Sequence, residues 1–309
     1  MCPASERLGA HRCGSVAIVG RPNVGKSTLL NRFLRQKIAI VSHKPETTRD
    51  RLLGVLTLPD AQILFLDTPG IYRGAKTLMA KHQVQVAREA LAEADVLLMM
   101  TEAQAGFTDE DKDLLRLLPK RSPEGEGVPV FLAINKVDRV KKDLILPQLA
   151  VAGQLYPFRE EFPISAESGT NVKELLEALA HSLPEGPPHY PGTQVTDRPV
   201  RTMAQELIRE QVLLFTHEEV PYSVAVLIEE WREGVRGAKI YVRATIYVER
   251  DSQRIILIGK AGALLKKVGQ AARKGIETLA ERPVFLDLWV KVAKNWRKDP
   301  VMLRRLGYG

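Results

Sequence analysis

The sequence predicts two domains: an α/β domain with a mostly parallel sheet and helices on both of its faces, and a smaller α+β domain after it. Three observations support this prediction. Residues 14–183 contain short apolar runs that are each followed by a polar motif or a helix-like segment. Residues 184–200 contain five prolines, which exclude a helix there and indicate a linker. Residues 201–309 show a different order of helical and alternating patterns.

The first apolar run, residues 16–19, leads into the segment GRPNVGKST and then into a helix-like pattern over residues 28–34. A strand, a glycine-rich turn and a helix start direct several backbone N–H groups at one point, which the helix dipole makes attractive to phosphate. We expect Lys26 to reach the β- and γ-phosphates and the Ser27 hydroxyl to bind Mg²⁺. A chance match is the alternative, and the strand and helix patterns on either side disfavour it. The predicted nucleotide-binding residues here are Gly20, Arg21, Pro22, Asn23, Val24, Gly25, Lys26, Ser27 and Thr28.

A second apolar run, residues 63–66, ends at the motif DTPG. An aspartate at the carboxyl end of such a strand can hold Mg²⁺ through a water, and a glycine after it lets its backbone N–H approach a γ-phosphate. Thr48 lies in a polar stretch between strand candidates, and its hydroxyl is predicted to close on Mg²⁺ when a triphosphate is bound. Lys26, Thr48 and Gly70 are the predicted catalytic residues. This motif adds Asp67, Thr68, Pro69, Gly70 and Ile71 to the predicted nucleotide site.

Two further motifs indicate which base is bound. The motif NKVD, from Asn135 through Lys136 to Asp138, follows the apolar run 130–134. The Asp138 carboxylate can accept hydrogen bonds from guanine N1–H and the exocyclic amine, a donor pair that adenine lacks. Ser165 and Ala166 follow the run 162–164 and would supply a backbone N–H to guanine O6. Four motifs in this order resemble the translation-factor-related GTPases, which implies GTP and GDP as ligands with Mg²⁺.

One position departs from the Ras-like pattern. Ile71 stands where Ras-like GTPases place the glutamine that orients the attacking water, and isoleucine has neither donor nor acceptor. The sequence therefore resembles the group of GTPases with a hydrophobic residue at this position. In several of these relatives an asparagine at the position of Asn23 helps to bind K⁺, so the resemblance implies K⁺-stimulated hydrolysis. The alternative is that Asn23 only suits the tight turn, because asparagine tolerates left-handed backbone geometry.

The next two segments close the first domain. A helix capped by Asn171 is predicted to run through residue 183, and the proline-rich linker follows it. Beyond the linker, helical spacing covers residues 203–215, strand patterns cover 222–228, 239–249 and 284–292, and a lysine-rich helix is predicted over 263–279. For residues 255–258 the apolar pattern alone predicts a strand.

The segment LIGKAG at residues 257–262 is read differently in this context, since Gly259 and Gly262 stand between a strand and a basic helix. The order of elements resembles a type II KH domain, in which residues 255–258 would form a short helix instead. A GxxG loop of this kind clamps the backbone of about four single-stranded nucleotides. A lone GxxG is more often a turn or helix cap, and Ala261 departs from the glycine of many relatives. The resemblance implies RNA contacts from Gly259, Lys260, Ala261, Gly262, Lys266, Lys267, Arg273 and Lys274.

Composition and charge agree with this organisation. The 309 residues are 45% hydrophobic, which is sufficient for two cores. Cys2 and Cys13 show no zinc-ligand spacing and suit a reducing cytosol, and residues 1–13, predicted as an N-terminal extension, lack the apolar centre of a signal peptide. We therefore expect a cytoplasmic protein. The formal net charge is +8, and residues 250–309 carry 14 Lys and Arg against five Asp and Glu, which favours an anionic polymer as partner over a merely solvated helix face.

A GTPase domain joined to a type II KH domain is a rare combination. With KPETTRDR, NKVD, VERDSQ and IGKAG it makes the chain after its first dozen residues similar to the Era-like subfamily of GTPases. This resemblance implies binding of the 3′ end of small-subunit ribosomal RNA, coupled to the GTP state, and assistance in assembling the 30S particle. It also implies peripheral, partial contact with the inner face of the cell membrane, and no obligate protein partner is evident.

Two alternatives stay open. The first is a constitutive RNA-binding module whose nucleotide-sensing domain hardly hydrolyses GTP, which the residue at position 71 makes worth testing. The second is a GTPase that acts in tRNA modification or at another ribosomal site, which the KH resemblance argues against. Turnover in K⁺ buffer with RNA separates the first alternative, and crosslinking to ribosomal RNA separates the second.

Overall fold

The computed structural model describes residues 11–42, 44, 48–70, 77–120, 127–234 and 239–308. The chain divides into two compact units, and each is described by itself. The first unit comprises Met1–Ala39, Thr48–Gly74 and Gln83–Asp197, and the second comprises Ile40–Thr47, Ala75–His82 and Arg198–Gly309.

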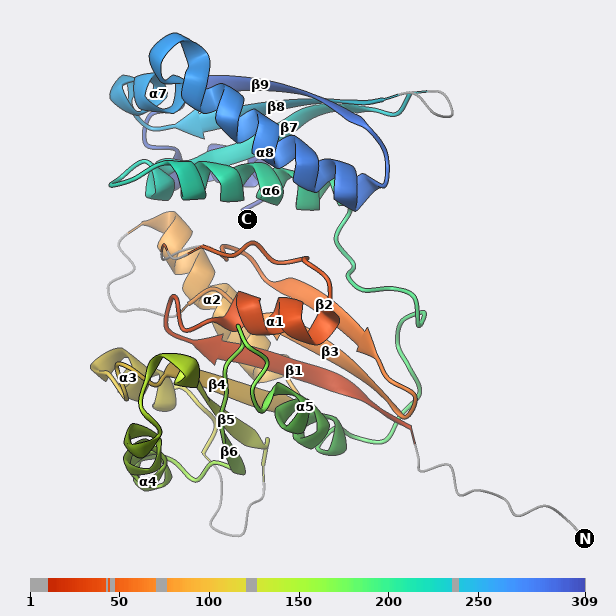
Figure 1. The fold of residues 1–309 in the computed structure, drawn as a ribbon, viewed down its shortest axis with the longest axis vertical. Helices are drawn as coiled ribbons and strands as arrows, with labels where there is room; N and C mark the ends of the chain where they lie inside the picture. The colour runs from red at the N-terminus through yellow and green to blue at the C-terminus, as the bar shows by residue number, and fades with distance from the viewer. Residues whose placement is uncertain are drawn as a thin grey trace, which may run out of the picture. The chain divides into compact units, whose positions relative to one another are not determined.

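The first unit is built on a six-stranded sheet in the order β2-β3-β1-β4-β5-β6 (Figure 1). Only β2 is antiparallel to its neighbour β3, and the other pairs are parallel. The central strands are almost continuously apolar, as expected for parallel strands that are covered on both faces. The strands are β1 (Arg12–Gly20), β2 (Leu52–Thr57), β3 (Ala61–Asp67), β4 (Val96–Glu102), β5 (Val130–Asn135) and β6 (Glu160–Pro163).

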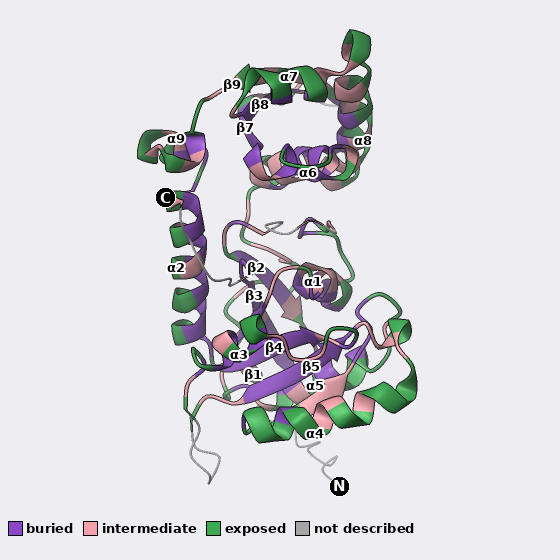
Figure 2. Ribbon diagram, turned by 90° about the vertical axis from the view of Figure 1, so that its left-hand side faces the viewer, coloured by how far each residue is buried: buried purple, intermediate pink, exposed green. Residues whose placement is uncertain are grey.

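Helices cover both faces of this sheet, as predicted. On one face lie α1 (Lys26–Leu34) and α5 (Val172–His181), and Phe33 of α1 stacks on Phe65 of β3 with ring centroids 4.8 Å apart (Figure 1). On the other face, Ala90, Leu114 and Ala152 share a buried core with the strands. These residues come from α2 (Leu78–Glu93), α3 (Asp109–Leu115) and α4 (Ile145–Leu155), and the buried strands form the centre of the unit in Figure 2. Two short 3₁₀ helices, η1 (Val137–Arg139) and η2 (Lys142–Leu144), precede α4.

Two boundaries differ from the sequence expectation. The strand β1 begins at Arg12, inside the segment predicted as an N-terminal extension, and Cys13 is already buried. The helix α5 ends at His181 rather than at residue 183. Asn171 stands at its N-cap position, but the side-chain amide donates to the Pro163 carbonyl, at 2.7 Å, instead of capping the helix.

Residues 184–199 contain no helix, as their prolines predicted, whereas α6 already begins at Val200, the last residue of the predicted linker. The linker is tied to the first unit by hydrogen bonds. The Val55 N–H of β2 donates to the Val195 carbonyl at 2.8 Å, and the Thr196 hydroxyl donates to the Leu53 carbonyl at 2.7 Å. Further back, the Gln62 side chain accepts from the backbone N–H of Tyr190 at 2.9 Å. The linker therefore follows the edge of the sheet up to residue 196.

The second unit has a three-stranded sheet in which β8 lies between an antiparallel neighbour, β7, and a parallel neighbour, β9. One face packs against helices α6 and α8 around a core that includes Ile208, Val242 and Ile276. The elements are α6 (Val200–Phe215), η3 (Pro221–Ser223), β7 (Ala225–Arg232), β8 (Ile240–Val248), α7 (Asp251–Ile258), η4 (Lys260–Gly262), α8 (Ala263–Ala280), β9 (Val284–Val292), η5 (Trp296–Lys298) and α9 (Pro300–Arg305).

The apolar segment before the GxxG loop is a helix, so the strand that its pattern alone predicted is wrong and the KH resemblance is right. In α7 only Leu257 of the apolar run is fully buried, whereas Ile255 and Ile256 are 66% and 52% exposed. Gln253 fixes the start of this helix, because its side-chain oxygen accepts from the N–H groups of Glu249 and Arg250 at 2.9 and 3.0 Å. Within the part of the chain that the structure describes, no helix has the length and apolar character that a membrane crossing requires.

Candidate functional site

The predicted nucleotide residues gather at one edge of the six-stranded sheet. The strands β1, β3 and β5 are parallel and end at Gly20, Asp67 and Asn135. In open α/β sheets ligands bind beyond the carboxyl ends of the strands, at a point where the strand order reverses. Here the chain passes from β1 outward to β3 on one side and to β4 on the other, so the loop after β1 lies at such a point.

Glycine is required at two places around the loop after β1, once within the loop and once in the segment after β3 that lies against it. Gly25 has a φ of 105°, and a Cβ atom there would lie 2.2 Å from the Asn135 side-chain nitrogen. A Cβ atom on Gly70 would lie 2.8 Å from the backbone nitrogen of Pro22. The helix α1 begins directly after Gly25, with the Leu29 N–H donating to the Gly25 carbonyl at 2.9 Å. The turn and the helix N-terminus therefore form a concave surface of backbone atoms. A side chain in place of either glycine would crowd this surface.

Lys26 lies inside this loop and is only 6% exposed. Its ammonium donates to the carbonyls of Gly20 and Arg21, at 2.8 and 3.0 Å. Burial lowers the pKa of Lys26 to about 8, and the positive charge of Arg21 acts in the same direction, against the carboxylates of Asp67 and Asp111. A phosphate group would supply the negative charge that this buried ammonium requires.

Three oxygen atoms from three segments meet beside Lys26. The Ser27 hydroxyl donates to the buried Asp67 carboxylate at 2.8 Å and lies 3.1 Å from the Thr48 hydroxyl. The Thr48 hydroxyl donates to the same Asp67 oxygen at 3.2 Å. Hydroxyl and carboxylate oxygens are the donors that Mg²⁺ prefers, so these residues fit a magnesium ion. Thr68 supports them by donating to the Ile18 carbonyl at 2.9 Å.

The two base-recognition motifs are also brought together. The Asn135 amide donates to the Val24 carbonyl at 2.7 Å and accepts from the Ala166 N–H at 2.9 Å. Asn135 thus connects the phosphate loop to the segment of Ser165 and Ala166. The Asp138 side chain is 32% exposed and lies 3.8 Å from the Arg139 guanidinium. Lys136 adopts a left-handed backbone, with a φ of 64°, between these two residues.

The structure does not test two predicted features of the site, the role of Ile71 and the binding of K⁺ by Asn23. Ile71 lies outside the described residues. Asn23 is exposed and has a φ of 64°, which agrees with the turn role proposed as the alternative for this residue and leaves its role toward K⁺ untested.

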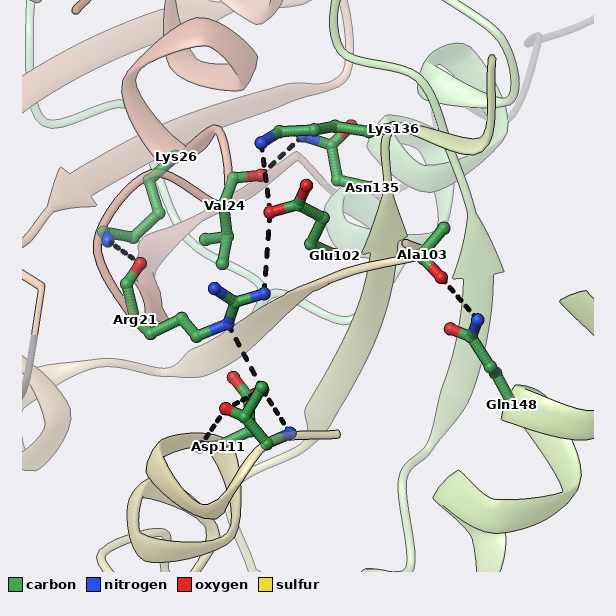
Figure 3. A network of polar contacts seen from close by, with 10 residues as sticks. Arg21, Val24, Lys26, Glu102, Ala103, Asp111, Asn135, Lys136 and Gln148 are labelled. Carbon is green, nitrogen blue, oxygen red and sulfur yellow. Dashed lines mark hydrogen bonds and ion pairs between the residues drawn. The ribbon is translucent and has the colours of Figure 1, made fainter. Parts of the chain in front are cut away.

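Sequence reasoning missed three charged residues that hold this site. Arg32 of α1 donates to the carbonyls of Ala166, at 3.0 Å, and of Glu167. It therefore holds the predicted base-binding segment of Ser165 and Ala166 against α1. Glu102 and Asp111 form ion pairs with the phosphate loop (Figure 3). Glu102 could have been found, because it follows the apolar run of β4 in the same way that Asp67 and Asn135 follow theirs.

In the second unit, the GxxG segment joins α7 to α8. Gly259 has a φ of 72°, and a Cβ atom there would lie 2.9 Å from the Leu264 Cβ. Gly262 has a φ of 77°, and Ala261 also lies in the left-handed region with a φ of 50°. The main chain of the loop therefore has a positive φ at three positions. Glycine adopts this conformation without strain at two of them, whereas Ala261 adopts it at a cost in free energy.

The four predicted cations of α8 lie on two different sides of the helix. A Cβ atom on Gly269 would lie 3.3 Å from Leu288 of β9, and Lys266 and Arg273 are three and four residues away, on the same face. Lys267 instead places its ammonium 4.4 Å from the centre of the Phe215 ring of α6. Lys274 is seven residues further on and shares the side of Lys267. The sequence placed all four together, and the structure divides them into a β9 side and an α6 side.

Comparison with known proteins decides the family. Residues 15–136 match the family described as 50S ribosome-binding GTPase, and residues 219–297 match the KH domain family. GTPase Era of Geobacter metallireducens is 47% identical over 297 residues, which cover 96% of this chain and 98% of that protein. The chain belongs to the Era GTPase family. The same name is carried by a Heliobacterium modesticaldum protein that is 44% identical and covers 96% of the chain.

Solved Era structures share the whole fold. A crystal structure of Era in complex with MgGDPNP and nucleotides 1506–1542 of 16S ribosomal RNA has a TM-score of 0.92 and 41% identity, and the match covers 97% of this chain and 99% of that one. A variant of Aquifex aeolicus Era bound to GDP·AlF₄⁻ has a TM-score of 0.91 and 41% identity over 96% and 99% of the two chains. The predicted combination of a GTPase domain with a KH domain is thus confirmed, and Era family membership assigns GTP hydrolysis as the activity.

Proposed function

We propose that this protein is a GTP-hydrolysing switch that binds the 3′ end of small-subunit ribosomal RNA and assists small-subunit assembly and maturation. The observation that carries the proposal is the assembly of phosphate, magnesium and guanine motifs at one sheet edge, in a chain that also holds a KH-type GxxG loop. The presence of 16S RNA in a related Era structure supports ribosomal RNA as the ligand and the 30S particle as the wider partner.

The nucleotide is proposed to lie along the phosphate loop, with its base at the two base-recognition motifs. Lys26 would bind the β- and γ-phosphates, and the Gly70 N–H would contact the γ-phosphate. Asp138 would accept the hydrogen bonds of guanine N1–H and the amine, with Ser165 and Ala166 beside O6. The Ala166 N–H donates to Asn135 in this structure, so its contact with guanine would be shared with that hydrogen bond.

Ser27 and Thr48 are the proposed direct Mg²⁺ ligands, and Asp67 is proposed to hold the ion through a water. Mg²⁺ would neutralise charge on the phosphates when it is bound. The chain's own contribution is to hold these three oxygens within 3.2 Å of one another. For K⁺, which Asn23 is proposed to bind, the support is the family resemblance alone. Without a glutamine at position 71, unaided turnover is expected on the order of 10⁻⁴ to 10⁻³ s⁻¹, the range of Ras without its activator.

The RNA is proposed to bind along the GxxG loop and the β9 side of α8. Lys260 supplies charge inside the loop, and Lys266 and Arg273 lie on the helix face toward β9. Ile255 and Ile256 are exposed on the preceding helix and offer apolar contact for unstacked bases. Lys267 and Lys274 are expected to contribute less, because they belong to the α6 side.

The domain limits are proposed as a GTPase domain over residues 14–183, a linker over 184–200 and a KH domain over 201–309, after an extension over 1–13. The start of β1 at Arg12 supports beginning the GTPase domain at residue 12 instead of residue 14. A cytoplasmic location, which the cysteine usage favours, and partial peripheral contact at the inner face of the cell membrane, which the family resemblance implies, stay predictions.

Crosslinking to ribosomal RNA, with GDP and with a non-hydrolysable GTP analogue, tests the proposal directly. We expect strong crosslinks at the 3′ end of small-subunit RNA that differ between the two nucleotides. Lys26→Ala should abolish tight GTP binding and leave the RNA contact intact. Lys266→Glu should weaken RNA binding more than Lys267→Glu, its neighbour on the other side of the helix. Crosslinks that are the same in both nucleotide states, with no turnover in K⁺ buffer, would instead support a constitutive RNA-binding module.

A further inference from the structure

Glu102 is the last residue of β4 and joins two parts of the nucleotide site that are far apart in sequence. Its Oε2 atom lies 3.1 Å from the Lys136 ammonium and 3.5 Å from the Arg21 guanidinium (Figure 3). Arg21 belongs to the phosphate loop, and Lys136 belongs to the base-recognition motif. The Glu102 and Arg21 side chains are each 16% exposed, and Lys136 is 22% exposed, so water screens these ion pairs only in part.

The backbone fixes Glu102 in this position. The Gly106 N–H donates to the Glu102 carbonyl at 3.0 Å, closing a turn at the end of β4. The next residue, Ala103, donates its N–H to the Asn135 carbonyl at 2.8 Å. Glu102 therefore starts a short turn that is bonded directly to the strand end carrying the base-recognition motif.

Arg21 has a second carboxylate partner. Its Nε lies 3.4 Å from Oδ2 of Asp111, which is fully buried. The same oxygen accepts from the Thr108 N–H and hydroxyl, at 2.9 and 2.8 Å, in the cap of α3. The Arg21 carbonyl in turn accepts from the Lys26 ammonium at 3.0 Å. A change in the position of Arg21 would therefore also move the hydrogen-bond acceptor of Lys26, the lysine proposed to bind the phosphates.

The Glu102 carboxylate is the negative charge that Arg21 of the phosphate loop and Lys136 of the base-recognition motif have in common. The guanidinium of Arg21 and the ammonium of Lys136 both lie within 3.5 Å of the Glu102 Oε2 atom, so without its charge they would repel each other with less compensation. Lys136 also holds a left-handed backbone, with a φ of 64°, a conformation that persists only when its surroundings enforce it. Loss of the Glu102 charge would remove the carboxylate that Lys136 contacts at 3.1 Å and one of the two carboxylates beside Arg21, so it would weaken the restraint on both segments.

We propose that Glu102 is a positioning residue that couples the phosphate loop to the guanine-recognition segment, so that each is ordered by the other. The proposal rests on the proposed nucleotide site, and it adds an energetic link between the two halves of that site. Such a link is reciprocal: a ligand that orders the phosphate loop raises the affinity of the base segment by the same factor as the reverse.

A mutant cycle on GDP affinity tests the coupling. Arg21→Gln and Lys136→Gln are made singly and together, first in the native background and then with Glu102→Gln, and GDP dissociation constants are measured. In the native background we expect the double variant to differ from the product of the single effects by at least about fivefold, as groups in one network do. With Glu102→Gln the effects should multiply within about twofold, as they do for independent sites.

Glu93→Gln serves as the matched control, because it removes a carboxylate from an exposed pair with Arg51, whose side chain is 41% exposed. It should leave GDP affinity unchanged. Independent effects of Arg21→Gln and Lys136→Gln in the native background would overturn the proposal, and so would a coupling that persists undiminished with Glu102→Gln. If Glu102→Gln fails to fold, Glu102→Asp takes its place in the cycle, because the shorter side chain withdraws the carboxylate from both cations, and the same two outcomes decide. A wild-type protein that does not bind GDP would overturn the proposed function itself.

Discussion

Nucleotide binding should take up a proton at Lys26. In the free protein, burial lowers the pKa of this ammonium to about 8. The phosphates of a bound nucleotide favour the charged form and raise the pKa again. Because the bound pKa is the higher of the two, binding is linked to protonation, and affinity must fall as the pH rises through the free value.

The size of the effect follows from the free pKa of about 8. At pH 7 binding should take up only about 0.1 proton, whereas at pH 8.5 it should take up about 0.8. GDP affinity should fall about tenfold between pH 7 and pH 9, which corresponds to about 1.4 kcal/mol.

Titration calorimetry in two buffers with different protonation enthalpies measures this uptake directly. The base N1–H also begins to titrate at the upper end of the range, so a reference is needed. Lys26→Arg provides it, because the guanidinium stays charged throughout and any remaining uptake comes from the base. Equal uptake at pH 7 and pH 8.5 in the wild type would refute the linkage and with it the placement of phosphate beside this lysine.

Three further outcomes are expected. Asp138→Asn should lower GTP affinity by about 1–3 kcal/mol, through the unpaired guanine donors, and shift preference toward xanthine nucleotides in competition binding; unchanged GTP affinity would remove the assignment. Hydrolysis should be faster in K⁺ than in Na⁺ at matched ionic strength, and Asn23→Ala should erase the difference; equal wild-type rates would count against a K⁺ site. Changing Lys260 and Ala261 together to Asp should reduce RNA affinity more than tenfold, about 1.4 kcal/mol, in a filter-binding assay, while intrinsic GTPase activity stays unchanged. Normal RNA binding, or loss of both activities together, would contradict the loop assignment.

The parts of the fold that could be predicted from sequence are those whose signal is local. The phosphate loop needs a strand, a glycine-rich turn and a helix in immediate succession, and all three stand within residues 12–34. The strand β9 was predicted with the bounds it has, Val284–Val292. The helix α7 could not be predicted from its pattern, because four consecutive apolar residues suit a buried strand as well as a helix with two exposed isoleucines.

The parts of the site that escaped prediction depend on long-range partners. Glu102 is 81 residues from Arg21 in the chain. Its place after the apolar run of β4 indicates the edge of the sheet, but the sequence does not indicate that it pairs with Arg21. For the same reason, Lys267 could not be separated from Lys266 before Phe215 was located beneath it. The chemistry of motif residues can be predicted from the local sequence. For the residues that position them, the sequence gives the charge, and only the fold gives the partner.

The hydrogen bonds between the linker and β2 have a consequence for the behaviour of the protein at high concentration. β2 is the outermost strand on its side of the sheet, and an open strand edge is a template for pairing with another chain. Val195 and Thr196 occupy the outward-facing groups of Val55 and Leu53, and the prolines of the linker cannot extend the ladder further. Proteolytic cleavage in this segment would therefore uncover an aggregation-prone edge while leaving the nucleotide site itself untouched.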